Sequence, residues 1–426
     1  MVLIRPALFL LVGVLAGAGC TQSLFDEGGA TAADVDDVPR TCPSPCLADA
    51  AADFARGVGS PWRYLDDHRD RTWTAMTGDQ TRTGADPANH IASCAANADN
   101  AACRGLSAGL LVASAGATHS ADPAIELTIP TSQVVQLVVR AYLASGADQP
   151  IRLYRNSRED LLYAGVAKAG VGLSHAITLD ALAGDRFLLA VAPNGNGAEV
   201  AVQLFASPTG AVFPSSCQVA VSFAAAAGNT ADNLCGSDFT HKLYDGDMDT
   251  PPPLAAGPFT ELGNAADLTS DAYFESTTIL DKTHDTTVQL WVKLRAFVDS
   301  YDAWLFSDLD LNTTGGLGIA IVNRSPVVLD VATTLTATPT SNTFSDAIAP
   351  YPMDAGWHFV RAVHTNGSLN VCIDGVRKAN VAVPAGFLRS TFAPYLGKNA
   401  VWTPQGAFVN GEIDDVRVLT GALPCE

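Results

Sequence analysis

The sequence has few charged residues, and acidic ones are in clear excess. Charged residues make up 16% of the 426 residues, against about 25% in an average globular protein. The chain has 25 Lys and Arg against 44 Asp and Glu, so its formal net charge is −19. No Lys/Arg cluster or stripe of stacking aromatics occurs. Because an acidic surface repels nucleic acid and anionic lipid heads, the composition excludes a nucleic-acid-binding protein.

Two common catalytic motifs are also absent. The sequence has no Gly-x-Ser-x-Gly nucleophile elbow and no His-Glu-x-x-His zinc motif. Its eight histidines are scattered, and neither His358 nor His364 has a ligand partner close by in the sequence. These absences argue against a serine hydrolase and a zinc protease.

The N-terminus has the three-part layout of a secretory signal. Arg5 is followed by an apolar run from Ala7 to Leu15 and then by small residues before Cys20. The run is shorter than the about 20 residues of a transmembrane helix. A cysteine in this place resembles the acylated cysteine of bacterial lipoproteins. We therefore expect residues 1–19 to be removed and Cys20 to be lipidated, which places the protein in the outer membrane or at the cell surface.

The alternative is an ordinary cleaved signal, which makes the protein periplasmic or secreted. In either case residues 20–41, which are small, polar and acidic, predict a flexible, disordered tether.

Of the nine cysteines, eight remain when Cys20 is set aside. An even number in an exported chain indicates a disulfide framework. Eight cysteines allow roughly a hundred connectivities, so the sequence alone does not fix the pairing. Proximity suggests the pairs Cys42–Cys46, Cys94–Cys103, Cys217–Cys235 and Cys372–Cys425. No histidine or second cysteine pair lies near Cys42 and Cys46, which disfavours a zinc site.

Residues 42–213 consist of short β-prone segments separated by Gly, Asn and Asp turns, with one short helix possible between Leu47 and Ala55. This pattern is typical of a β-sandwich. The clearest expected strands are Ala124–Ile129, Val134–Leu143, Ile151–Tyr154, Arg186–Ala192 and Glu199–Phe205. This pattern of short strands and turns resembles jelly-roll accessory domains of bacterial secreted proteins.

Residues 214–426 carry three motifs in order. They are Thr287–Lys293 (TVQLWVK), Trp357–Arg361 (WHFVR) with the hairpin Leu369–Gly375 (LNVCIDG), and Gly411–Arg417 (GEIDDVR). Through them the region resembles the laminin-G-like, concanavalin A-like jelly-roll family. The resemblance implies a second, lectin-like sandwich. We thus expect an all-β protein with two jelly-roll sandwiches in tandem.

The first motif also has the period of a strand that is buried on one face. Val288, Leu290, Val292 and Leu294 alternate with Gln289, Trp291 and Lys293. Trp357 is expected to be a core aromatic that bridges the two sheets.

Glu412-Ile413-Asp414 invites comparison with laminarinase-type glycoside hydrolases, which share this jelly roll. Those enzymes carry a second Glu that is separated from Glu-Ile-Asp by one or two residues, and their retaining mechanism needs two carboxyl groups about 5–5.5 Å apart. Val416 and Arg417 stand where the second Glu is required. We therefore expect a protein that is not an enzyme.

Asp245, Asp247 and Asp249 alternate along the chain and offer the oxygen ligands that Ca²⁺ prefers. Laminin-G-like domains often hold one Ca²⁺ at a rim, and the resemblance suggests that Asp414 approaches such a site. The alternative is a solvated Asp-Gly turn.

Tyr301, Trp304, Tyr395 and Trp402 are candidates for a sugar-stacking platform. Trp402 lies in an expected loop, where sandwich domains present ligand contacts. Trp304 is equally compatible with core packing.

Two functions remain open. The first is a surface binding or adhesion protein that recognises a glycan or an extracellular protein and touches the membrane through its lipid alone. The second is an accessory or degenerate glycoside-hydrolase-like protein that targets polysaccharide for a partner enzyme. The missing catalytic pair favours the first.

Overall fold

The computed structural model describes residues 41–54, 61–70, 72–78, 81–84, 89–94, 101–104, 111–114, 121–192, 199–223, 230–243, 253–259, 262–268, 272–297, 302–309, 315–335, 343–386, 392–399 and 409–425. The signal, Cys20 and the rest of residues 1–40 lie outside these ranges. None of the helices in these ranges is long and apolar enough to cross a membrane.

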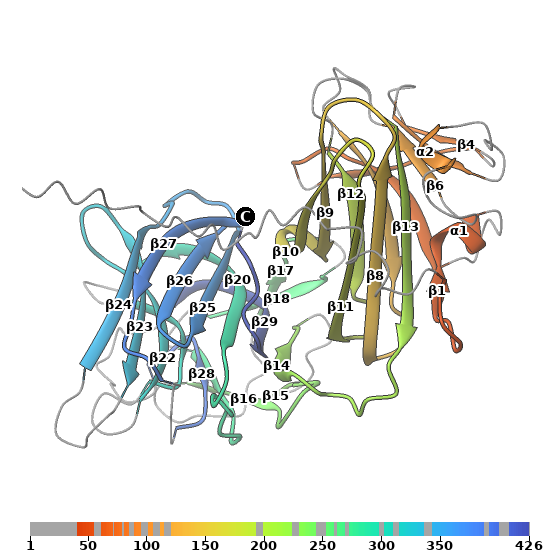
Figure 1. Cartoon of the computed structure of the whole chain (residues 1–426). Coiled ribbons are helices and arrows are strands. Elements are labelled where there is room, and N and C mark those ends of the chain that lie inside the picture. Colours follow the sequence, from red (N-terminus) through yellow and green to blue (C-terminus); the bar gives the residue numbers. More distant parts are fainter. Residues whose placement is uncertain are drawn as a thin grey trace, which may run out of the picture.

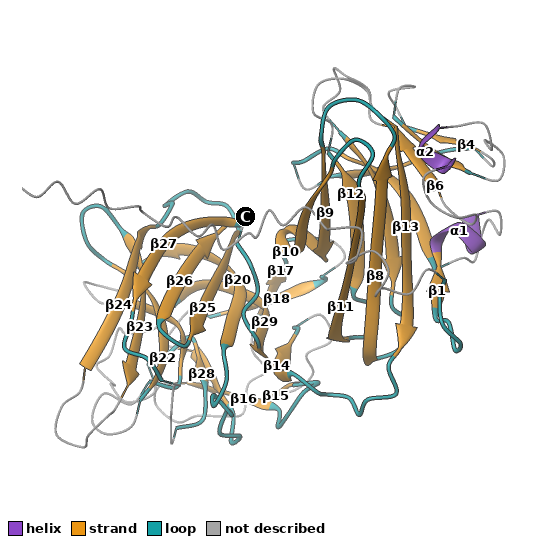
Figure 2. Ribbon diagram, viewed as in Figure 1, coloured by secondary structure: helices purple, strands orange, loops and turns teal. Residues whose placement is uncertain are grey.

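The described chain forms two β-sandwiches that lie beside each other (Figure 1). Strands dominate it (Figure 2), and two four-residue helices, α1 (Ala50–Asp53) and α2 (Ala101–Arg104), accompany the first sandwich. Helix α1 lies in the segment where a helix was expected, and the Asp49 side chain caps it by accepting hydrogen bonds from the N–H groups of Ala51 and Ala52. The expected all-β fold is confirmed.

The first sandwich has a seven-stranded and a six-stranded sheet, and its strand pairs are antiparallel. The first sheet has the order β11-β8-β13-β6-β5-β4, with β1 also on β13, and the second has the order β10-β9-β12-β7-β2-β3. The strands are β1 (Ala48–Asp49), β2 (Trp62–Asp67), β3 (Trp73–Ala75), β4 (Thr81–Thr83), β5 (His90–Ser93), β6 (Leu111–Ser114), β7 (Asp122–Thr128), β8 (Gln133–Leu143), β9 (Gln149–Arg155), β10 (Ser157–Ala167), β11 (Gly172–Ala181), β12 (Arg186–Val191) and β13 (Glu199–Pro208). Alternate apolar residues of both sheets, such as Val139 and Leu153, form the core between them.

The second sandwich has two eight-stranded sheets. The inner sheet, which faces the first sandwich, has the order β17-β18-β29-β20-β25-β26-β27, with β14 on β29, and the outer sheet has the order β15-β16-β19-β28-β21-β22-β23-β24. The strands are β14 (Cys217–Val221), β15 (Thr230–Ala231), β16 (Phe239–Leu243), β17 (Leu254–Ala256), β18 (Asn264–Asp267), β19 (Ala272–Glu275), β20 (Thr286–Ala296), β21 (Ala303–Ser307), β22 (Gly316–Val322), β23 (Val328–Leu335), β24 (Thr343–Pro350), β25 (His358–Thr365), β26 (Ser368–Ile373), β27 (Val376–Ala382), β28 (Tyr395–Leu396) and β29 (Asn410–Thr420). The three sequence motifs lie on the neighbouring strands β20, β25, β26 and β29, at the centre of the inner sheet.

Strand β20 shows the expected alternation but not the expected exposure. Val288, Leu290 and Val292 point into the core between the sheets. On the opposite face Gln289 and Trp291 are 0% and 1% exposed, so the prediction of a half-buried strand is wrong there. The first sandwich is the reason, because Gln289 Nε2 donates a hydrogen bond (3.1 Å) to its Asp160.

Trp357 does not bridge the two sheets, and that prediction is wrong as well. The side chain is half-buried and packs against an aromatic cluster on the other face of the inner sheet, formed by Phe259, Trp291 and Phe359. Phe259 also lies 6.1 Å, between ring centroids, from Trp73 of the first sandwich. The aromatics therefore pack where the two sandwiches meet rather than inside the second one.

Buried ion pairs join the sandwiches. Asp160 of the first accepts hydrogen bonds from Arg361 of the second and, at 2.7 Å, from its own neighbour Arg155. Asp185 is paired with Arg417 of the second sandwich. All five side chains of this network, Asp160, Asp185, Arg155, Arg361 and Arg417, are at most 4% exposed. Opposite charges thus meet across the interface, as the burial of ionised groups requires.

A further contact fixes the segment between the sandwiches. The Asp180 carboxylate, at the end of β11, accepts hydrogen bonds from the backbone N–H groups of Ser215 (2.9 Å), Ser216 (2.5 Å) and Cys217 (2.7 Å). Burial alone opposes ionisation, but these N–H donors hold the pKa of Asp180 below its usual value. The chain thus enters the second sandwich in a defined direction.

The structure contains the four disulfides that sequence proximity suggests. Their Cα–Cα distances are 5.5 Å for Cys42–Cys46, 5.6 Å for Cys94–Cys103, 5.7 Å for Cys217–Cys235 and 5.9 Å for Cys372–Cys425. These lie in the usual range for disulfides. Cys372–Cys425 ties β26 to the C-terminal segment, close to the interface between the sandwiches.

Candidate functional site

The outer sheet of the second sandwich carries the candidate binding surface. Its inner face belongs to the core through Phe274, Leu305 and Leu396. The alternation of side chains along each strand therefore sends Tyr273 of β19 and Tyr395 of β28 to the opposite face, which is turned away from the first sandwich.

Two tyrosines and a lysine meet on this face. The Tyr273 and Tyr395 ring centroids are 6.1 Å apart, with the ring planes tilted by 38°. Lys398 Nζ lies 4.3 Å from the Tyr273 centroid and 5.5 Å from that of Tyr395, within the range of a cation–π contact. Tyr273 is 8% exposed, so the accessible part of the group consists of Tyr395 and Lys398, which are partly exposed. We call these three residues the tyrosine–lysine surface.

Two charged neighbours flank the tyrosine–lysine surface. Lys242 of β16 stands opposite Tyr273 in the strand register, and Glu275 stands opposite Tyr395. Lys242 and Glu275 form an ion pair with each other. Burial raises the pKa of both tyrosines, so their hydroxyls stay protonated at neutral pH and remain able to donate hydrogen bonds.

Trp304 lies on the same sheet face, on β21, the strand beside β28. Its ring lies over Gly318, where the Cβ of any larger residue would come within 2.5 Å of ring carbon Cζ3. The residue is partly exposed and does not belong to the core of the second sandwich. Trp402 and Tyr301 lie outside the described residues, so their part in a platform stays a prediction.

The sequence reasoning singled out Tyr395 and Trp304 but missed Tyr273, Lys398 and Lys242. Tyr273 follows from the same alternation, because Ala272 and Phe274 on either side of it are core residues. The sequence around Lys398 does not indicate that it lies near Tyr273, since its position depends on how β28 pairs between β19 and β21.

Glu412 does not have the surroundings of a catalytic acid. It is 4% exposed, and its carboxylate is paired with Arg295 and with Lys293, whose Nζ is 2.9 Å from Oε2. Arg295 also holds Asp267 through two hydrogen bonds of 2.8 and 2.9 Å. Each carboxylate oxygen of Glu412 therefore lies beside a cation.

A β-bulge sets the direction of the side chains that come after Asp414. Gln289 pairs with Arg417 while Trp291 pairs with Asp414, so Asp415 and Val416 together face one residue of β20. Asp415 has a φ of 43°, in the left-handed region. Val416 consequently points into the core, and Arg417 points out to Asp185. Where a hydrolase carries its second carboxylate, this chain thus has Val416, which packs in the core, and Arg417, which contacts the first sandwich.

Asp414 is fully buried, and burial, together with the neighbouring Asp415, raises its pKa to about 8. Its Oδ1 accepts a hydrogen bond (2.8 Å) from the Asp415 N–H, while Oδ2 has no hydrogen-bond partner within the described part of the chain. A carboxyl group that stays protonated at neutral pH is a poor calcium ligand.

No group of three or more His, Cys, Asp or Glu side chains that could hold a metal ion occurs among the residues that the structure describes. Asp245, Asp247 and Asp249 lie outside those residues, so calcium binding at that loop stays a prediction.

Comparison with known proteins gives no significant match among curated proteins. Solved structures with a similar fold include domain 4 of an extracellular arabinanase from Geobacillus stearothermophilus in complex with arabinotriose, at 21% identity and a TM-score of 0.37, covering 49% of this chain and 93% of that domain. Another is the binding domain of botulinum neurotoxin serotype D, at 12% identity and a TM-score of 0.36, covering 49% and 48%. A third is the binding domain of botulinum neurotoxin DC in complex with SialylT, at 13% identity and a TM-score of 0.34, again covering 49% and 48%. The chain thus spans about half the length of these toxin domains.

A family model matches the part of the chain that holds all three motifs. It covers residues 268–426, and the resemblance predicted from the motifs is confirmed there. The second sandwich is a lectin-like jelly roll, similar over residues 268–426 to the concanavalin A-like lectin/glucanases superfamily.

Proposed function

We propose that this protein is an exported, lipid-anchored surface protein that binds a glycan on the outer sheet of its second sandwich and does not cleave it. The observation that carries the proposal is the tyrosine–lysine surface, in which the partly exposed Tyr395 ring lies 6.1 Å from the buried Tyr273 ring and the Lys398 ammonium group lies beside both.

The chemistry of the surface suits a sugar. An aromatic ring packs against the C–H face of a pyranose, and a tyrosine hydroxyl bonds to sugar hydroxyls. Lys398 adds hydrogen-bond donors and a positive charge on a protein whose formal net charge is −19. That charge favours hydroxyl-rich or acidic sugars over apolar ligands.

The absence of turnover rests on the surroundings of Glu412. A retaining glycosidase needs one carboxylate that attacks and a second that protonates the leaving oxygen. Glu412 is buried under two cations, and Val416 occupies the core. Among the described residues, these side chains leave the Glu-Ile-Asp segment without a catalytic partner.

A glycan array tests the proposal. The whole protein is the correct sample, because the isolated second sandwich would expose Gln289, Arg361 and Arg417 to water. Tyr395→Ala should lower the affinity for the bound glycan by at least about tenfold, as the loss of an aromatic anchor does. Tyr395→Phe, which keeps the ring, should retain most of the affinity. If Tyr395→Ala and Tyr273→Ala are both folded and bind the glycan with unchanged affinity, the tyrosine–lysine surface is not the binding site.

A further inference from the structure

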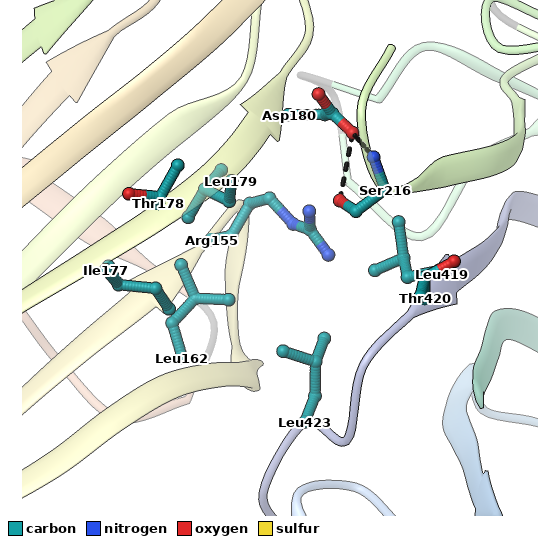
Figure 3. A pocket seen from close by; sticks show the side chains of 10 residues that line it. All are labelled: Arg155, Leu162, Ile177, Thr178, Leu179, Asp180, Ser216, Leu419, Thr420 and Leu423. Carbon is teal, nitrogen blue, oxygen red and sulfur yellow. Dashed lines mark hydrogen bonds between the residues drawn. The ribbon is translucent and has the colours of Figure 1, made fainter. Parts of the chain in front are cut away.

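A small pocket lies where the edge of the first sandwich meets the second sandwich. Leu162 of β10 and Leu179 of β11, the edge strands of the first sandwich's two sheets, form one side of it. Leu419 and Leu423 of the second sandwich close the other side (Figure 3). The walls of the pocket come from both sandwiches and combine leucine and isoleucine side chains with polar ones.

Arg155 brings an unused hydrogen-bond donor into this pocket. Its side chain is 2% exposed, and the guanidinium points into the space between Ser216, Thr420 and Leu423 (Figure 3). Nε donates to Asp160 at 2.7 Å, but the buried Nη2 has no hydrogen-bond partner among the described residues. A buried N–H without an acceptor is unfavourable, so an acceptor in the pocket would be favoured.

The other polar groups of the pocket do not fill this role. The Asp180 carboxylate is turned to Ser216 and already accepts the three backbone N–H groups of Ser215, Ser216 and Cys217 (Figure 3). Thr420 Oγ1 accepts a hydrogen bond from Gln218 Nε2 at 3.2 Å, which leaves its hydroxyl hydrogen to be donated. The Thr420 hydroxyl is turned away from Arg155, so the donor that faces an incoming group comes from the Arg155 guanidinium (Figure 3).

We propose that the pocket binds a short-chain monocarboxylate, the size of acetate or propionate, whose carboxylate accepts a hydrogen bond from Arg155 Nη2. Its hydrocarbon end lies against Leu162 and Leu423. A carboxylate fits better than a phosphate, because the Asp180 carboxylate already places a negative charge at the wall of the pocket and disfavours a doubly charged ligand. The ligand touches both sandwiches and thereby stabilises their arrangement.

The size of the pocket supports this class of ligand. Its volume is about 70 Å³. A cavity of about 150 Å³ takes up benzene, which has six heavy atoms, so the smaller volume of this pocket requires a ligand with fewer heavy atoms than benzene. Acetate and propionate meet this limit and hexanoate exceeds it.

The test is a titration of the purified whole protein with sodium acetate, propionate and hexanoate, followed by calorimetry and by thermal unfolding. Sodium chloride at equal ionic strength is the control. Acetate and propionate should release or absorb heat at one site and raise the melting temperature, and hexanoate should do neither. Arg155→Met, which keeps an unbranched apolar stem but has no donors, should bind at least about tenfold more weakly.

Leu423→Phe provides a variant that leaves the ion pairs in place. It narrows the pocket and should abolish acetate binding, whereas Leu234→Phe, at a side chain that is 50% exposed, should not. The proposal is wrong if acetate and propionate give the same heat and the same melting temperature as sodium chloride. That result is expected of a pocket that holds only water. It is also wrong if folded Leu423→Phe binds acetate as the unaltered protein does.

Discussion

The guanidinium of Arg417 in the second sandwich forms a bidentate ion pair with the Asp185 carboxylate of the first. Nη2 lies 2.9 Å from Oδ1, and Nη1 lies 3.2 Å from Oδ2. Burial by itself would raise the pKa of Asp185, but Arg417 lowers it to about 2. The last residue of the GEIDDVR motif therefore serves the contact between the two sandwiches.

Arg417→Ala should destabilise the protein strongly, because it leaves Asp185 buried without its cation. Breaking a buried pair from one side costs about 3–5 kcal/mol. Denaturant unfolding measures the loss, and Arg324→Ala, at an exposed position, is the matched control. Asp185→Asn combined with Arg417→Met should cost less than the sum of the single variants. Additive losses would show that the two side chains are not coupled.

Stability should also depend on pH through Asp414. Its folded-state pKa of about 8 lies above the usual value of about 4, so between these values the unfolded state releases a proton that the folded state keeps. Stability should therefore fall as the pH rises from about 4 to 8, by up to about 1.4 kcal/mol per pH unit, and then level off.

Asp414→Asn removes this titration, and its free energy of unfolding should change less over the same pH range. Asp148→Asn, at an exposed aspartate, serves as the control. An unaltered pH profile in Asp414→Asn would mean that Asp414 is ionised in the folded protein.

The Cys372–Cys425 disulfide should contribute more to stability than Cys42–Cys46. The two bonds span sequence separations of 53 and 4 residues. The loop-entropy relation then gives about 4 kcal/mol for the first and about 2 kcal/mol for the second. Serine at both cysteines of each pair, followed by denaturant unfolding, measures the two losses, and equal losses would contradict the entropic explanation.

Cys20→Ser tests the proposed anchor. Without the thiol no lipid is attached, so the protein should leave the membrane fraction while its melting temperature stays the same. Mass spectrometry of the unaltered protein should show acyl chains on Cys20. Membrane association that survives the substitution, with no acyl mass found, would exclude a lipoprotein.

The strands could be predicted from the sequence because alternation and turn residues are local properties. The expected segments at 134–143 and 186–192, for example, correspond to β8 and β12. The motif-bearing strands were expected from the resemblance to the jelly-roll family, and alternation indicated the first of them as well. Residues 268–426 also match the expected superfamily.

The contact between the sandwiches could not be predicted, because alternation shows that a face is polar but not what covers it. The sequence alone places Gln289 and Arg361 in solvent, whereas in the structure both donate hydrogen bonds to Asp160 of the first sandwich. Lys398 of the binding surface was missed for a similar reason, since strand pairing far along the chain brings it to Tyr273. Trp357 was misplaced because a large aromatic fits an interface as well as a core.

The central claim is that this protein binds a glycan and does not cleave it. The most direct measurement is the release of reducing ends from the glycan that it binds, for the unaltered protein and for Glu412→Gln, alongside the affinity of both. We predict no release by either protein and affinities within about twofold of each other, because Glu412 is buried under Lys293 and Arg295. Hydrolysis by the unaltered protein that disappears in Glu412→Gln would contradict the account.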